Sequence, residues 1–403
     1  MLKRAEHIQF PEWVKIPVSM QHQFFELAAK EAQKTKLRLL EQRNRLEQLR
    51  PLLPFGRVQE SDEWRSWRIA YVDGSDSPVI SQRLGARFGT YAAGWNIYQG
   101  DELQKEDYFS GRMVDFETED VEVTKKTLDL LAAALERDVA LKCLADESPD
   151  LIVIDGSFFG FRSRARMIRG RKIGQQRFEY GSDLIDYVVN STSTLLRSGK
   201  AIGVIKRVTT AAIDGWVITR DGDDGNVLHA NDRHILSSLM SVGEIFSYTS
   251  TFGDEQAFSM LSRLASAYRR YIERLGVRDI DVILRNVRSE IEASIRRNLA
   301  CAPDVVLATE RMYLRSDYPA PPMCIEVKAG ADVSKILPYL IATHNRATGL
   351  PLPLDMIDQN VGLPRGFTRE FVEEIEASLV RDSELDKFDL QSHFAHLNPQ
   401  KEE

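Results

Sequence analysis

Two aspartates of this chain each end an apolar run and precede a Gly-Ser pair. Asp73 follows the run Ile69-Ala-Tyr-Val72, and Asp155 follows Leu151-Ile-Val-Ile154. Apolar runs without polar alternation are typical of strands buried on both faces of a sheet. A glycine lets the chain turn sharply as it leaves such a strand, and open α/β sheets bind ligands at the carboxyl ends of their strands. We therefore expect two carboxylates together at one edge of a central sheet.

Paired carboxylates at neighbouring strand ends suit a divalent metal ion, because carboxylate oxygens are the hard ligands that Mg²⁺ and Mn²⁺ prefer. A third acid often comes from a helix packed beside the strands. Glu136 is the candidate here, since it lies one helical turn from both Ala132 and Ala140, where small side chains permit close approach. The alternative for each Asp-Gly pair is a turn acid that caps its own backbone.

Basic residues follow Asp155 and a further apolar run. Arg162, Arg164 and Arg166 come soon after Asp155, and Lys206 ends a further apolar run. A run of cations is usually only a solvated surface, but beside a metal site these side chains could contact phosphates. They are candidates for phosphate contacts.

One histidine is a further candidate. His344 lies on the apolar face of a predicted helix. It could be a buried core histidine, or it could protonate a leaving oxygen or hold a phosphate.

The elements that must position these residues follow a recognisable order. Residues 66–105 read as a meander of three strands, residues 120–145 as a helix and residues 151–155 as a buried strand. A β-β-β-α-β order, with acids at the ends of the first and fourth strands, is the layout of the ribonuclease H-like fold. We predict an α/β fold, a mixed sheet flanked by helices, with helical extensions at both ends.

The expected domain organisation has three parts. They are an N-terminal arm and long helix that could mediate dimerisation (1–64), a catalytic domain (65–350) and a C-terminal helical and acidic tail (351–403).

Bulk composition is that of an ordinary globular protein. The chain has 403 residues, of which 43% are hydrophobic and 28% charged. Its net charge of −7 argues against DNA binding by the whole surface but leaves room for a local basic patch. No apolar stretch is long enough to cross a membrane, and the N-terminus lacks the apolar core of a secretory signal. Three widely spaced cysteines indicate a reducing cytoplasm and no structural zinc site.

Several motifs together resemble the NurA nucleases of DNA end processing. They include both Asp-Gly-Ser motifs, Glu136, the strand that ends at Lys206, Asn231-Asp-Arg233 before a leucine-rich helix, and His344 in Pro338-Tyr-Leu-Ile-Ala-Thr-His344. The resemblance covers about residues 65–350.

This resemblance implies a ribonuclease H-like deoxyribonuclease that uses Mn²⁺, with Mg²⁺ possible. It would be a 5′-to-3′ exonuclease on single- and double-stranded DNA with single-strand endonuclease activity. It also implies a homodimer that works with HerA, a hexameric DNA-translocating ATPase, in DNA end resection or repair. By resemblance, Asp73, Glu136 and Asp155 hold the metal and His344 is an auxiliary catalytic residue. The chain has no phosphate-binding loop of its own, so ATP use would come from the partner.

Two alternatives stay open. Asp317 with Glu326 and Lys328 resembles the acid and Glu-x-Lys pattern of restriction-type endonucleases. A ribonuclease H-like adaptor that binds DNA or an ATPase without cutting is the other.

Overall fold

The structure, a computed structural model, describes residues 15–116, 120–175, 177–253, 257–381 and 387–397. The chain divides into two compact units, Met1–Leu53 and Pro54–Glu403. The described part of the first unit contains the long helix α1 (Val18–Leu49) and the short 3-10 helix η2 (Arg50–Leu52). Within α1 only Leu49 is buried, and several of its large apolar side chains, such as Phe25 and Leu37, are exposed.

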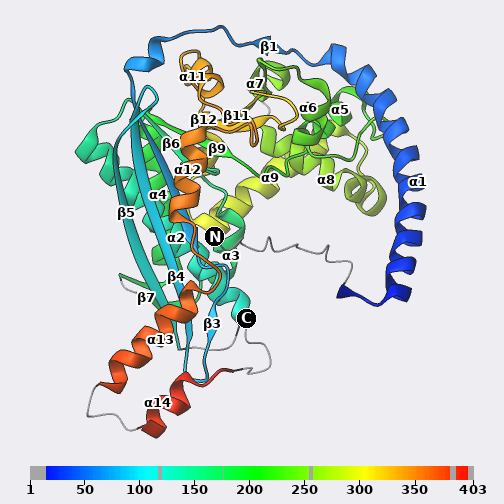
Figure 1. Cartoon of the computed structure of the whole chain (residues 1–403). Helices are drawn as coiled ribbons and strands as arrows, with labels where there is room; N and C mark the ends of the chain where they lie inside the picture. The colour runs from blue at the N-terminus through cyan, green and yellow to red at the C-terminus, as the bar shows by residue number, and fades with distance from the viewer. Residues whose placement is uncertain (1–14, 117–119, 176, 254–256, 382–386, 398–403) are drawn as a thin grey trace, which may run out of the picture. The chain divides into compact units, whose positions relative to one another are not determined.

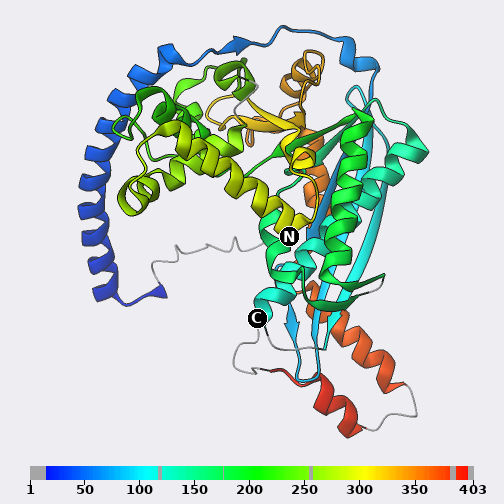
Figure 2. The same cartoon turned by 180° about the vertical axis from the view of Figure 1, so that it is seen from behind.

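The second unit is built around one mixed sheet (Figures 1 and 2). Ten strands of the described chain form it, in the order β1-β10-β11-β12-β9-β6-β2-β4-β3, with β5 on the free side of β4. Their bounds are β1 (Gly56–Arg57), β2 (Arg68–Asp76), β3 (Ser81–Gln82), β4 (Arg87–Gln99), β5 (Glu102–Asp115), β6 (Leu151–Asp155), β9 (Ala201–Ile205), β10 (Glu244–Ser247), β11 (Thr309–Leu314) and β12 (Met323–Lys328). The strands β7 (Lys172–Gln175) and β8 (Phe178–Tyr180) form a separate hairpin.

The centre of the sheet is parallel. β6 runs parallel to β2 on one side and to β9 on the other, whereas every other pairing in the sheet is antiparallel. The carboxyl ends of these three strands therefore lie at the same edge of the sheet. All five residues of β9 are buried, and so are the first four of β6, as expected for strands covered on both faces.

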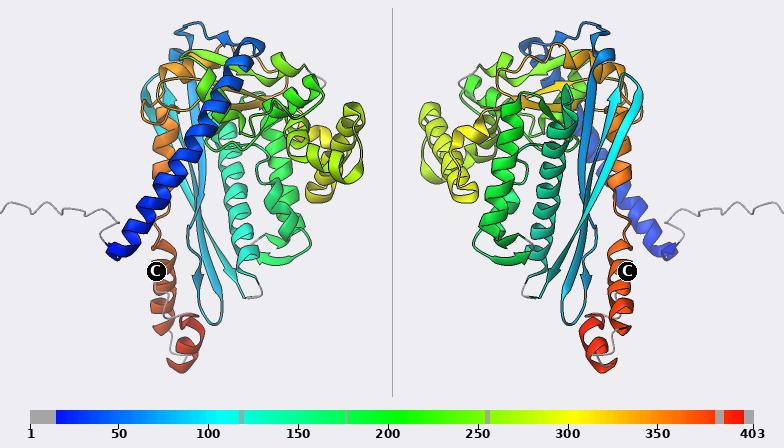
Figure 3. Two further views of the ribbon diagram at one scale, coloured as in Figure 1. Left: turned by 90° about the vertical axis from the view of Figure 1, so that its right-hand side faces the viewer. Right: turned by 90° about the vertical axis from the view of Figure 1, so that its left-hand side faces the viewer.

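Helices cover the two faces of this central region (Figure 3). On one face, α2 (Val121–Glu147) packs against β2 and β4 and against α4 (Gly181–Ser198). On the other, α12 (Leu352–Val361) packs against β2 and β4, and Tyr339 of α11 (Ile336–Ala342) contacts Tyr71 of β2. A hydrophobic core cluster lies on this second face and includes Val153, Leu354 and Ile357.

Further helices fill the connections. Their bounds are η3 (Glu63–Ser66), α3 (Arg162–Ile168), α5 (Ala212–Asp221), α6 (Asp232–Leu239), α7 (Tyr248–Phe252), α8 (Phe258–Leu275), α9 (Ile280–Leu299), α10 (Pro303–Leu307), α13 (Phe367–Val380) and α14 (Lys387–Phe394). Most lie between β9 and β11, where α5 packs on α8, and α8 on α9. The predicted mixed sheet flanked by helices, with helical regions at both ends, is confirmed.

The meander differs in detail from the prediction. Residues 66–105 were predicted to form three strands. The structure has β2, a short β3 and one continuous β4 there. It also has the strand β5, which the sequence did not indicate and which pairs along β4. Most side chains of β5 are exposed and polar, so an apolar run is absent. Its pairing with β4 follows from the tight turn at Gly100, whose φ is +60°.

Candidate metal centre

The two predicted aspartates meet at the carboxyl edge of the parallel strands. Val72 of β2 is paired with Ile154 of β6, so the next residues along each strand are Asp73 and Asp155. Side chains alternate between faces along a strand. Each aspartate therefore shares its face with the core residue two positions earlier, Tyr71 or Val153. Both carboxylates point to the side of the sheet that α12 covers.

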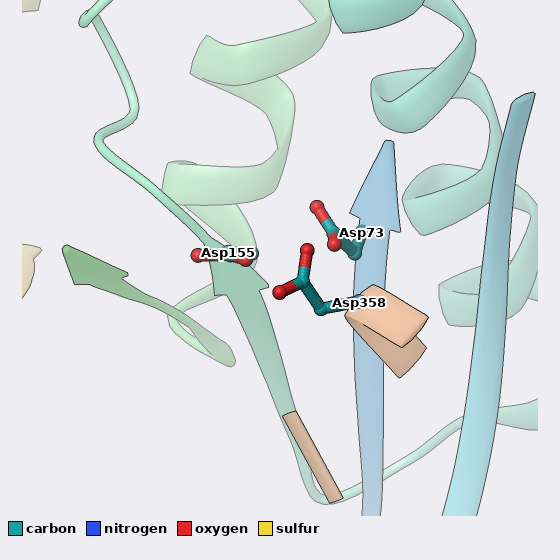
Figure 4. Close-up of side chains that lie close together, drawn as sticks. All are labelled: Asp73, Asp155 and Asp358. Carbon is teal, nitrogen blue, oxygen red and sulfur yellow. The ribbon is translucent and has the colours of Figure 1, made fainter. Parts of the chain in front are cut away.

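A third carboxylate comes from α12. Asp358 follows the buried Ile357 on this helix. Oxygen atoms of Asp73, Asp155 and Asp358 all lie within 4.8 Å of one another (Figure 4). Asp73 is buried, Asp155 is partly exposed and Asp358 is exposed, so the cluster opens to solvent on the α12 side.

Within the described part of the chain, one cation pairs with this cluster. The Nζ atom of Lys206 lies 2.6 Å from Oδ2 of Asp155 and 2.8 Å from Oδ2 of Asp358. Lys206 follows β9 directly, and β9 is the parallel neighbour of β6. One ammonium group against three carboxylates leaves the cluster short of positive charge.

The pKa values of two of these acids are raised. Burial raises the pKa of Asp73 well above its usual range, and the carboxylates of Asp155 and Glu136 raise it further. Burial also raises the pKa of Asp155 to about 6, although Lys206 acts in the opposite direction. A divalent cation would relieve the repulsion, and three carboxylates are a donor set that Mg²⁺ and Mn²⁺ prefer. The residues present therefore fit such an ion.

Glu136 lies behind β2 rather than within the group of three. A Cβ atom placed on Gly74 would meet Glu136 Cβ at 2.9 Å and Oε2 at 3.2 Å, so α2 contacts the strand directly there. Glu136 is buried and forms an ion pair with Arg137. Burial raises the pKa of Glu136 to about 6, Arg137 lowers it and Asp155 raises it. Glu136 is thus electrostatically coupled to the cluster from the opposite face.

His344 follows α11 and pairs with a different acid. Its Nε2 atom lies 3.2 Å from Oδ2 of Asp317, and its Nδ1 atom lies 2.6 Å from the Ile341 carbonyl oxygen. Both ring nitrogens therefore face oxygen acceptors. The group of three carboxylates does not include Asp317.

The four residues predicted to contact DNA lie in four different environments. Arg164 pairs with Asp129 at 3.3 Å, and Arg166 is exposed. Arg162 lines a cavity together with Ser157 and Arg311. Lys206 is in the carboxylate cluster itself.

The Glu-x-Lys alternative has its residues in separate places. Glu326 is buried, accepts a hydrogen bond from the Phe158 backbone N–H at 2.8 Å and pairs with Arg311 at 3.2 Å. Asp317 contacts His344, and Lys328 is exposed at the end of β12.

Sequence reasoning missed Asp358. It lies beyond residue 350, in the segment taken as a C-terminal extension, and no short motif surrounds it. The available signal is weak: Leu354, Ile357 and Val361 form an apolar stripe, which predicts a packed helix but not which acid faces the sheet.

Comparison with known proteins identifies the class. The NurA domain family matches residues 56–362, from the start of β1 to the end of α12, so the chain belongs to this family. The solved structure of the NurA nuclease from Sulfolobus solfataricus is similar, with 14% identity, coverage of 92% of this chain and 100% of that chain, and a TM-score of 0.55. This likeness shows a shared fold.

Two other solved structures are more distant. NurA bound to dAMP and manganese has 14% identity, covers 92% of this chain and 99% of that chain, and has a TM-score of 0.41. Endonuclease V from Bacillus subtilis has 13% identity, covers 82% and 91%, and has a TM-score of 0.32. Comparison with curated proteins gave no match. Among the described residues, no helix is long and apolar enough to cross a membrane.

Proposed function

We propose that this protein is a metal-dependent deoxyribonuclease that hydrolyses phosphodiester bonds at the Asp73–Asp155–Asp358 cluster. The observation that carries the proposal is the meeting of three carboxylates within 4.8 Å at the carboxyl ends of parallel strands. Membership of the NurA domain family supports it. One solved structure of NurA contains manganese, and another contains dAMP and manganese. A metal-dependent nuclease is consistent with both.

The metal is proposed to be Mn²⁺, with Mg²⁺ able to replace it. Asp73, Asp155 and Asp358 would hold it, and Glu136 would complete the set from the α2 side. When bound, such an ion supplies an activated water and stabilises charge on the leaving oxygen. Lys206 bridges Asp155 and Asp358 and would contact the phosphate of the bond that is cut.

His344 is proposed as the auxiliary residue. Asp317 and the Ile341 carbonyl contact the ring nitrogens from both sides. To hold a phosphate or protonate the leaving oxygen, the ring would exchange one of these partners for the substrate. Arg162, Arg164 and Arg166 would contact the DNA backbone.

The finer assignments rest on the family resemblance. They are 5′-to-3′ exonuclease activity on single- and double-stranded DNA, single-strand endonuclease activity, a homodimer, and work in the cytoplasm with a HerA-type hexameric ATPase in DNA end resection or repair.

The test is cleavage of end-labelled DNA with Mn²⁺, Mg²⁺ or EDTA. We expect metal-dependent cutting by the wild type and a loss of about 10²- to 10³-fold in Asp73→Asn, the scale of removing one charge-stabilising group. Asp101→Asn, in an exposed turn, is the control. Cutting that survives Asp73→Asn but is lost in Glu326→Gln would move the site to the Glu-x-Lys residues. A protein that binds DNA but is inert with every metal would be an adaptor.

A further inference from the structure

A cavity of ≈ 520 Å³ lies where β6 and β9 end. Its wall includes Ser157, two residues after Asp155, and Thr209, three residues after Lys206. Two residues of extended chain span at most about 7 Å, so this wall begins close to the carboxylate cluster. The remaining walls come from α3, the first half of α8, α9 and α10, and from Arg311 and Glu326 on β11 and β12. Arg311 and Glu326 point to the sheet face opposite to the carboxylates, because their neighbours Met312 and Ile325 belong to the core on the α12 side. The cavity therefore lies at the same edge of the sheet as the metal centre, but on the other face.

A flat cationic group forms part of its lining. The guanidinium of Arg311 donates within its plane to Ser157 Oγ at 3.0 Å and to Glu326 Oε1 at 3.2 Å. One face of the guanidinium covers the ring of Phe258, at 4.6 Å from the centroid. Phe258 is in turn stacked on Tyr248, with centroids 5.5 Å apart and planes at 15°. Tyr248, Phe258 and Arg311 therefore form a three-layer stack, and its last layer, Arg311, lines the cavity.

A second cation beside this stack has no acidic partner among the described residues. Arg162 lines the cavity and is half-buried, and no ion pair of the described chain involves it. Burial and the positive charge of Arg311 both lower the pKa of Arg162. A guanidinium in this setting is stabilised by an anion, and Arg binds phosphate with its planar fork of N–H donors.

Hydroxyl groups complete the lining. Ser163, Thr210, Ser259 and Thr309 contribute, and the buried Oγ of Ser259 has no hydrogen-bond partner in the described structure. Phosphate-binding cations, a planar stacking surface and hydrogen-bonding hydroxyls are together what a nucleotide requires. A carbohydrate or an apolar ligand would leave Arg162 without its anion.

We propose that this cavity receives one nucleotide of the DNA strand as the strand passes the sheet edge at which the bond is cut. Its phosphate contacts Arg162, and its base, removed from the stack of neighbouring bases, lies against the guanidinium of Arg311. This assignment rests on the proposed nuclease function. Bases stack on guanidinium planes without regard to sequence, so the cavity would hold any base and position the strand at the metal centre.

The probe is a set of short oligothymidylates, each with one abasic nucleotide at a different position. Binding is measured by fluorescence anisotropy in EDTA, so that nothing is cut. For the wild type, we expect the abasic nucleotide to weaken binding about tenfold at one position and little elsewhere, the scale of one lost stacking contact. Equal effects at every position would overturn the proposal.

Tryptophan variants inside and outside the cavity test whether the abasic effect comes from the cavity. Ser163 is an exposed helical residue that lines the cavity, whereas Thr194 is an exposed residue of α4 outside it. Ser163→Trp should bind the intact strand about as weakly as the wild type binds the abasic one, and the abasic position should then add nothing. Thr194→Trp should behave as the wild type. Arg311→Lys keeps the charge but loses the plane, and should lose the abasic effect too. A position-dependent effect that persists in Ser163→Trp would overturn the proposal.

Two further outcomes separate related ideas. A wild type that shows the position-dependent effect but cuts no DNA would overturn the nuclease function and leave the nucleotide site. A wild type that cuts DNA without any position-dependent effect would leave the nuclease function and overturn the nucleotide site. Free dTMP distinguishes the source of the nucleotide: dTMP binding that Ser163→Trp abolishes, without an abasic effect in strands, would assign the cavity to a released product and overturn the strand nucleotide.

Discussion

At the scale of single residues, charge balance defines the site. Three carboxylates face one ammonium group, and the most buried of them, Asp73, has the acids of both sheet faces as neighbours. Lys206 partly neutralises the cluster in this structure, because it pairs with both Asp155 and Asp358. A divalent ion would add the positive charge that Lys206 alone does not supply.

Asp358→Asn tests the acid that comes from α12. We expect nuclease activity to fall about 10²- to 10³-fold and the concentration of Mn²⁺ needed for half-maximal activity to rise, because one of three charged ligands is lost. Gln359→Ala, the exposed neighbour on the same helix, should leave both unchanged. Wild-type metal dependence in Asp358→Asn would remove this residue from the site.

The raised pKa of Asp155 predicts how the metal-free protein responds to pH. Its folded pKa of about 6 exceeds the unfolded value of about 3.9, so between these values the folded protein binds a proton that the unfolded chain has released. The free energy of unfolding should therefore decrease as pH rises from about 4 to about 6, and this contribution should level off above.

Thermal unfolding in EDTA, compared between wild type and Asp155→Asn, measures this contribution. The advantage of Asp155→Asn over the wild type should grow through that pH window. Parallel curves would contradict the assignment. Added Mn²⁺ should stabilise the wild type more at pH 7.5 than at pH 5, since protons compete with the metal for the same oxygens.

At the scale of elements, the close approach of α2 to β2 brings Glu136 to the site. Gly74 permits it, because any larger residue would meet both the side chain of Glu136 and the Ala132 carbonyl oxygen. The helix begins at an Asp120 cap, whose carboxylate accepts the Glu122 N–H. The helix that the sequence predicted from residue 120 is therefore the one that packs against β2.

Gly74→Ala tests that approach. The added methyl group should destabilise the protein by roughly 1–3 kcal/mol, as overpacking does, and displace Glu136 from the strand. Unfolding in urea and cleavage rate are the measurements, and both should decline. Gly170→Ala is the matched control, because a Cβ there meets nothing within 4 Å. Equal behaviour of the two variants would show that α2 can withdraw without cost.

At the scale of the whole molecule, the chain consists of a helical unit and a larger unit that holds the site. The family match, residues 56–362, begins after the first unit. The described part of the first unit exposes several large apolar side chains of α1, among them Leu27, Leu37 and Leu40. Such a surface suits association with another chain, and a second copy is the occupant that we propose.

Deletion of residues 1–53 tests this hypothesis. We expect the remaining unit to fold, because it has its own core, and to be monomeric where the full chain is dimeric. Light scattering after gel filtration measures the mass, and circular dichroism controls for folding. A deletion variant that remains dimeric would place the dimer interface elsewhere.

Local sequence determined the two strand-end aspartates, the helix that carries Glu136 and the class of fold. Apolar runs, helical spacing and the glycine turns act over a few residues, so a pattern reveals them. The local pattern did not reveal β5, because most of its side chains are polar and exposed. This strand is defined by its pairing with β4.

Tertiary structure alone decided the composition of the site. Asp358 joins Asp73 and Asp155 because the apolar stripe of α12 packs on β2, far from either aspartate in the chain. Packing likewise placed His344 against Asp317, Arg164 against Asp129, and Lys206 between two carboxylates. These partners depend on which surfaces meet after the strands and helices have formed, and no local pattern encodes that choice.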